Sequence, residues 1–145
     1  MALPLLIIML GGAADYGLAQ YDRALLANAV SAGAQYAYLT GTSVITSDIT
    51  SVIRSTSTLP NASTSVTVVY SSVSPGVPGP GGGWYCITGT APTVTSSQSG
   101  GVCGDGSAAG YYISMKATYT FNGLMGGFMS LATNSISEQA TVKIQ

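Results

Sequence analysis

Apolar residues recur at intervals of three and four along the first 40 positions, which is the spacing of an α-helix. The apolar set is Leu18, Tyr21, Leu25, Ala29, Ala32, Tyr36 and Leu39. The opposite side of the helix carries Gln20, Ala24, Asn28, Ser31 and Gln35. Pro4 is compatible with a first helical turn, and residues 40–43 supply a stop. The pattern predicts one helix from Pro4 to Tyr38, about 50 Å long at ~1.5 Å per residue.

The front half of this helix is apolar on all sides. Residues 1–14 carry no charge, and Asp15 is the first ionisable side chain. A secretory signal peptide cut after Ala14 is one alternative, but such peptides begin with a basic residue and none precedes this run. We therefore expect lipid or other protein chains to cover the front half, with the helix-to-helix contacts made by Leu5, Ile8, Leu10, Ala13, Gly17, Leu18 and Leu25.

Small residues follow one another at four-residue spacing on the same helix. Ala13 and Gly17 form one such pair, and Ala29, Gly33 and Ala37 form a second series. This spacing lets two helix backbones approach closely. For residues 20–39 a helix packed on the protein's own sheet explains the small residues equally well.

The pattern of residues 41–145 predicts a small globular unit, which we call the head. Ser47 and Asp48 resemble an N-cap pair for a short helix that ends before Pro60. Strands are expected at 65–73, 84–87, 111–121 and 136–145. The strand at 111–121 has the cleanest alternation of apolar and polar residues. Residues 75–83 are too rich in Pro and Gly for a regular element. The predicted fold class is α+β: a long N-terminal hydrophobic helix at 1–40, followed at 41–145 by a small antiparallel sheet head with one short helix.

Charge is scarce: 4 Lys or Arg and 5 Asp or Glu in 145 residues, with no His. Without a basic cluster nothing neutralises phosphates, so nucleic-acid binding is disfavoured. Without His the usual general base and zinc ligand are missing, which disfavours most hydrolase mechanisms and metal sites. Near-zero net charge favours association, because little self-repulsion keeps molecules apart.

Two cysteines and three helix charges are the candidate special residues. Cys86 and Cys103 favour a disulfide that closes a loop in an oxidising compartment, and two reduced buried thiols are the alternative. Asp15 and Asp22 lie on nearly the same helical stripe, with Arg23 beside the second. We expect charge contacts between subunits: an ion pair between helices for Asp22 and Arg23, and for Asp15 a positive group such as a neighbour's N-terminal amine.

Three short motifs carry a family resemblance. The motifs are, in order, an apolar run at 2–10, Asp15-Tyr16-Gly17, and Ala-Gly-Ala-Gln-Tyr-Ala at 32–37. Near the far end of the chain they are followed by a strand at 115–121 and a terminal strand at 136–144. In this order they resemble TadE-like proteins, the minor pilins or pseudopilins of the tight-adherence pilus in the type IV pilus superfamily. That family usually carries Glu where this chain has Asp15.

The resemblance implies a structural subunit of a bacterial surface filament. Its helix would lie in the inner membrane before assembly and in an extracellular pilus afterwards, with copies of itself or other pilins as partners. No enzymatic activity, cofactor, metal or small-molecule substrate is expected. The alternative is a membrane-anchored or secreted adhesin-like module, in which the helix is a simple tether and exposed Trp84, Tyr85 or the Gly-Pro loop contacts glycans or surfaces.

Overall fold

The computed structural model describes residues 3–70, 84–88, 93–121 and 135–145. Two α-helices come first, α1 (Leu3–Thr40) and α2 (Thr46–Thr56), and short 3-10 turns follow each of them at 41–43 and 61–63. The strands are β1 (Thr64–Tyr70), β2 (Trp84–Thr88), β3 (Thr93–Ser97), β4 (Gly110–Thr120) and β5 (Ser135–Lys143). The predicted α+β fold, with a long N-terminal helix and an antiparallel sheet, is confirmed.

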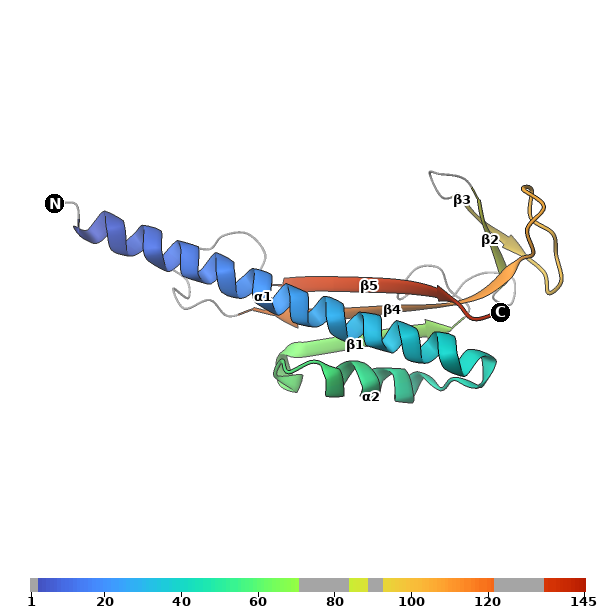
Figure 1. Cartoon of the computed structure of the whole chain (residues 1–145), viewed down its shortest axis with the longest axis horizontal. Helices are drawn as coiled ribbons and strands as arrows, with labels where there is room; N and C mark the ends of the chain where they lie inside the picture. The colour runs from blue at the N-terminus through green and yellow to red at the C-terminus, as the bar shows by residue number, and fades with distance from the viewer. Residues whose placement is uncertain (1–2, 71–83, 89–92, 122–134) are drawn as a thin grey trace.

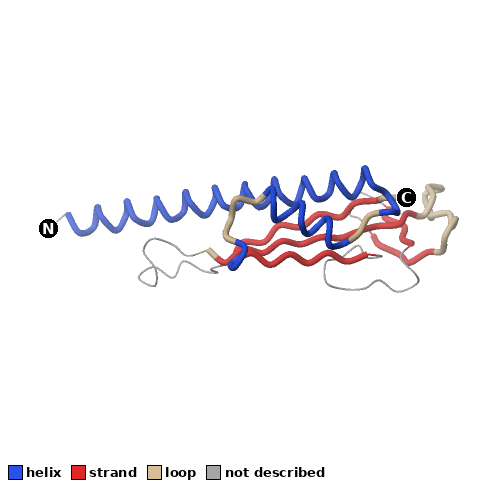
Figure 2. The backbone as a smooth tube through the Cα atoms, turned by 90° about the horizontal axis from the view of Figure 1, so that it is seen from below, coloured by secondary structure: helices blue, strands red, loops and turns tan. Residues whose placement is uncertain are grey.

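Strand β4 is the centre of the sheet. It pairs antiparallel with β1 on one side and β5 on the other, and its first residues also pair with β2, which continues into β3. Both helices lie on one face of the β1–β4–β5 part, so the molecule has a helical layer over a sheet layer (Figures 1 and 2). The β2–β3 hairpin lies at the end of the sheet farthest from the N-terminus (Figure 1).

The main core lies between these two layers. The alternation predicted for β4 holds on one face, where Ile113, Met115 and Ala117 are fully buried and face the helices, but Ser114 on the opposite face is fully buried as well. From the helical layer, Leu26, Ala29, Val30 and Ala37 of α1 and Ile49 and Ile53 of α2 complete the cluster. The second half of α1 is therefore part of the core of the head.

Close helix packing explains the second series of small residues. A Cβ placed on Gly33 would lie 2.6 Å from Cγ1 of Ile53 and 3.4 Å from Sδ of Met115. Ala29 and Ala37, one turn to either side, are fully buried. These residues let α1 approach α2 and β4 of the same chain, which is the intramolecular explanation left open above.

The first half of α1 continues beyond the sheet. In Figures 1 and 2 the N-terminal part of the helix extends past the ends of β4 and β5, while its C-terminal part lies over them. At 38 residues α1 is about 57 Å long, since each residue adds ~1.5 Å. An extended strand of 9 to 11 residues, the length of β5 or β4, spans only some 30 to 37 Å.

Three local predictions were wrong. The apolar face of α1 was misplaced, because Leu18, Tyr21 and Leu39 are exposed and the buried face follows Leu26 and Val30. Helix α2 begins at Thr46 after Ile45, so Ser47 and Asp48 lie inside its first turn instead of capping it. Strand β3 was missed, since only Val94 in its Thr/Ser-rich sequence is apolar and that side chain is 46% exposed. The end of the strand predicted at 65–73 and the Pro- and Gly-rich stretch at 75–83 lie outside the described residues.

Candidate assembly surface on the N-terminal helix

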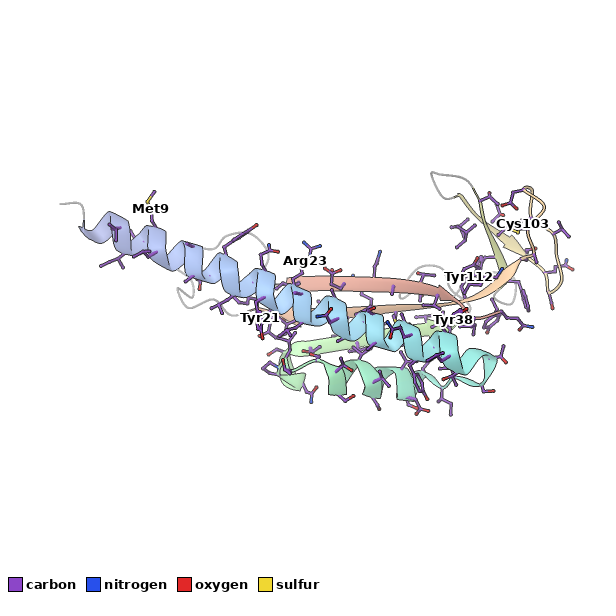
Figure 3. All side chains as sticks on the ribbon, in the orientation of Figure 1. Met9, Tyr21, Arg23, Tyr38, Cys103 and Tyr112 are labelled. Atoms are coloured by element: carbon purple, nitrogen blue, oxygen red, sulfur yellow. A yellow bond between two sulfur atoms is a disulfide. The ribbon has the colours of Figure 1, made fainter. Side chains whose placement is uncertain are left out.

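Large apolar side chains cover the projecting half of α1. Leu6, Ile7, Met9, Leu10, Tyr16, Leu18 and Tyr21 are between 42% and 69% exposed. Met9 points away from every other described element in Figure 3. Taking about 200 Å² for a large side chain, these seven expose on the order of 800 Å², which exceeds the ~300–600 Å² of the largest apolar patch on a typical monomer. We call residues 6–21 the front surface.

The residues predicted for helix-to-helix contact do not all lie on the front surface. Leu10, Ala13, Gly17 and Leu18 are exposed there, and Ile8 is half-buried. Leu25 instead packs against the chain's own core. The side chain of Leu5 lies outside the described residues. A Cβ on Gly17 would meet nothing within 4 Å, so the helix backbone is open to a close neighbour at this position.

Arg23 has a partner within its own chain. Its Nε donates a 2.6 Å hydrogen bond to Oε1 of Glu138 on β5, at the point where α1 leaves the sheet (Figure 3). No local pattern in the sequence indicates this pair, because its members are 115 positions apart. The contact between subunits predicted for Arg23 thus has an intramolecular competitor.

The second predicted acid, Asp22, lies close to Tyr119 of β4. Burial raises the pKa of the Asp22 carboxyl above its ordinary value. Burial also raises the pKa of the Tyr119 phenol, and the negative charge of Asp22 raises it further. Asp15, by contrast, lies on the projecting half of the helix, where it is half-buried. Asp22 and Arg23 therefore lie at the base of the projecting half of α1, whereas Asp15 lies on the front surface.

The two cysteines form the favoured disulfide. Cys86 of β2 and Cys103 are joined across a sequence separation of 17, with their Cα atoms 5.5 Å apart, and both are buried with Ala109. Nearby, Asp105 accepts hydrogen bonds at Oδ1 from the backbone N–H and the hydroxyl of Ser107, which stabilise a turn just after Cys103. The bridge ties the β2–β3 hairpin to the loop that leads into β4.

The aromatic residues of the hairpin are less accessible than the adhesin alternative requires. Tyr85 is only 3% exposed and stacks edge-on with Tyr112. Trp84 is half-buried and stacks edge-on with Tyr111, with ring centroids 5.9 Å apart. The prediction that Tyr85 is exposed was wrong. The Gly-Pro loop lies outside the described residues.

A shallow apolar groove lies at the other end of α1, beside β5. It has a volume of about 460 Å³ and is lined by Ser31, Ala34, Gln35, Tyr38, Leu39 and Val142. Tyr38 and Leu39 are 68% and 83% exposed, higher than any large apolar residue of β4 or β5. The sequence alone does not indicate this groove, because Leu39 and Val142, which both line it, come together only in the folded chain.

The comparison with known protein families bears on most of α1, not only on its projecting half. The family model described as TadE-like protein matches residues 1–35. The match confirms the resemblance found in the sequence and points to a pilus-associated protein of the cell envelope. No curated protein and no solved structure gives a significant match.

A membrane-spanning helix requires about 20 consecutive, predominantly apolar residues. Within the part of the chain that the structure describes, neither helix combines the length and the apolar character needed to cross a bilayer.

Proposed function

We propose that this chain is a structural, non-enzymatic subunit of a bacterial surface filament of the TadE-like type, and that it assembles by packing of its N-terminal helix. The observation that carries the proposal is the front surface. It projects beyond the sheet, it is apolar, and the chain's own described elements do not cover it. Removing this surface from water is a strong driving force, at roughly 25 cal/mol per Å² of apolar area.

The partners in this proposal are copies of the same chain or other pilins. The exposed area of the front surface, on the order of 800 Å², is about what each partner contributes to a stable protein–protein interface. Ala13 and Gly17 add exposed backbone that a neighbouring helix can approach closely. Before assembly, lipid of the inner membrane covers the front surface, and afterwards other subunits replace it in an extracellular pilus.

The arrangement of the charges also fits assembly. No ionisable side chain occurs before Asp15, so neighbouring subunits can bury residues 6–14 without desolvating a charge. The Arg23–Glu138 pair fixes the helix to the sheet immediately behind the front surface. The projecting half is thus held in a defined direction relative to the head, as a repeating assembly requires.

Electron microscopy of the purified protein tests this proposal. We expect filaments from the wild-type chain and none from Leu10→Glu, because the variant places an unpaired charge in the proposed interface. Ser51→Glu is the matched control: Ser51 is exposed on α2, away from the front surface, and this variant should assemble normally. Dispersed wild-type particles under all conditions, or unchanged filaments from Leu10→Glu, would overturn the proposal.

A further inference from the structure

The end of the molecule farthest from the N-terminus has a small core of its own (Figure 1). It consists of β2, β3 and the loop that leads into β4, and the disulfide holds these parts together. Its buried residues, Cys86, Cys103 and Ala109, form a cluster separate from the core between the helices and the sheet. We call residues 84–88 and 93–109 the far-end unit.

The strand pairing that joins the far-end unit to the main sheet is short. Within the described ranges, β2 pairs with β3 along its whole length, but with β4 only where Trp84 lies opposite Tyr111 and Tyr85 lies opposite Gly110. Edge-on ring contacts, Trp84 with Tyr111 and Tyr85 with Tyr112, cross the same boundary. The boundary therefore lies at the first residues of β4.

The last residues of β5 lie across this boundary. Nζ of Lys143 donates a 3.2 Å hydrogen bond to the backbone carbonyl of Ala108, which belongs to the far-end unit. Beside it, the backbone N–H of Ile144 donates to the carbonyl of Tyr111, and the N–H of Tyr111 donates to the carbonyl of Gln145, both at 2.8 Å. The end of β5 thus binds the start of β4 through its backbone and the far-end unit through a side chain.

Gly110 leaves the space that the Lys143 side chain occupies. A Cβ placed on Gly110 would lie 2.5 Å from Cε and 2.8 Å from Cδ of Lys143, and 2.9 Å from Cε2 of Tyr112. Gly110 is buried, whereas Lys143 is exposed. The aliphatic stem of the lysine therefore covers the backbone where β4 begins, while its ammonium reaches the Ala108 carbonyl.

We propose that Lys143 holds the far-end unit in one orientation relative to the helix–sheet core, and that the unit turns about Gly110 when the bond from Lys143 to Ala108 breaks. The disulfide does not fix this orientation, because both of its cysteines belong to the far-end unit. The bond is exposed, so water can replace the Ala108 carbonyl without any unfolding. Two separate cores joined at a short boundary favour such local opening. The inference goes beyond the proposed function and does not depend on assembly.

Distance measurements between two spin labels test this inference on the full chain. One label is attached at Gln98→Cys in the far-end unit and the other at Ser51→Cys on α2, both at exposed positions, and the native cysteines are already joined to each other. Labelled chains are diluted with unlabelled ones, so that only distances within one chain are measured. We expect one narrow distance in the otherwise wild-type chain. Lys143→Ala should abolish it and give a broad distribution.

Two further variants separate the stem from the hydrogen bond. Lys143→Met keeps an apolar stem over Gly110 but cannot donate to Ala108, so it should also broaden the distribution. Lys116→Ala is the matched control, because Lys116 is exposed on the same face of the sheet and lies away from the boundary. It removes the same charge and should leave the distance narrow. Amide hydrogen exchange at residues 113–119 should be unchanged in all three variants, which checks that the helix–sheet core is intact.

Several results would overturn the inference. If the distance stays narrow in Lys143→Ala, the strand pairing and the ring contacts hold the unit without the lysine. If it stays narrow in Lys143→Met, the stem holds the unit and the bond to Ala108 does not. A broad distribution in the wild-type chain, or faster exchange at 113–119 in Lys143→Ala, would contradict a local hold at this boundary. None of these results depends on filament formation, so the proposed function is tested separately.

Discussion

Arg23 and Glu138 join α1 to β5 through a 2.6 Å hydrogen-bonded ion pair, at the point where the helix leaves the sheet. The side chain of Glu138 is only 23% exposed and that of Arg23 is 60% exposed, so solvent screens the pair on one side. The pair therefore positions the helix more than it stabilises the fold.

Arg23→Ala should lower the free energy of unfolding by about 1 kcal/mol, mostly because it leaves a half-buried carboxylate without its donor. A double-mutant cycle with Glu138→Ala should give a coupling of about 0.5–1 kcal/mol that decreases with added salt. Arg54→Ala, at an exposed position on α2, is the control and should have almost no effect. A coupling near zero at low salt would mean that the pair does not hold the helix.

Gly33 is a second position where the structure makes a sharp prediction. A methyl group there would meet Ile53, which is fully buried and has little room to move. We expect Gly33→Ala to destabilise the head by about 1–3 kcal/mol, despite the better helix propensity of Ala. Gly17→Ala is the matched control: nothing lies near its Cβ, and the variant should be neutral or up to about 1 kcal/mol more stable in the unassembled chain. Equal effects in thermal or urea unfolding would contradict the packing described for α1 and α2.

The raised pKa of Asp22 predicts that the stability of the folded chain depends on pH. Its folded-state pKa is raised by burial, so the folded chain binds the proton more tightly than the unfolded chain. Stability should therefore fall as pH rises from the ordinary Asp pKa near 3.8 through the raised folded value, and the penalty should remain in full above it. Asp22→Asn should remove this fall and be more stable than wild type at neutral pH.

Tyr119 supplies an independent check on the same carboxylate. Loss of the Asp22 charge should lower the pKa of the Tyr119 phenol, which should still remain above its ordinary value because burial is the larger cause. NMR titration of labelled tyrosine rings measures this shift. An unchanged Tyr119 pKa in Asp22→Asn would show that the two groups do not interact.

The disulfide should act locally. Replacing both Cys86 and Cys103 by Ala should destabilise the hairpin region by up to about 3 kcal/mol, the chain-entropy value for a loop of this size. In hydrogen exchange we expect faster exchange at residues 84–88 and little change at residues 113–119, which belong to the other core cluster. Equal acceleration in both segments would show that the bridge supports the whole head.

Local patterns predicted the elements that have strong periodicity. The length of α1 and the alternation of β4 follow directly from the spacing of apolar residues. Strand β3 could not be predicted, because its Thr and Ser residues are extended only through pairing with β2. The buried face of α1 was misplaced for a related reason: the exposed Leu18 and Leu39 are as hydrophobic as the buried Leu26, and only tertiary packing tells them apart.

The candidate surface was only partly visible in the sequence. An uncharged run before Asp15 indicated a segment that needs partners, and that inference used composition alone. The Arg23–Glu138 pair and the groove at Val142 depend on contacts between residues more than a hundred positions apart. No local pattern carries such information, so the sequence indicates a segment that other molecules must cover but does not indicate these tertiary contacts.

The central claim is that other copies of the chain cover the front surface. Analytical ultracentrifugation of the purified wild-type protein in detergent-free buffer tests it most directly. The account predicts large assemblies in equilibrium with few free chains, and a shift toward smaller species when Leu10→Glu is introduced. A single stable species at the monomer mass of 14.6 kDa, unchanged by that substitution, would contradict it.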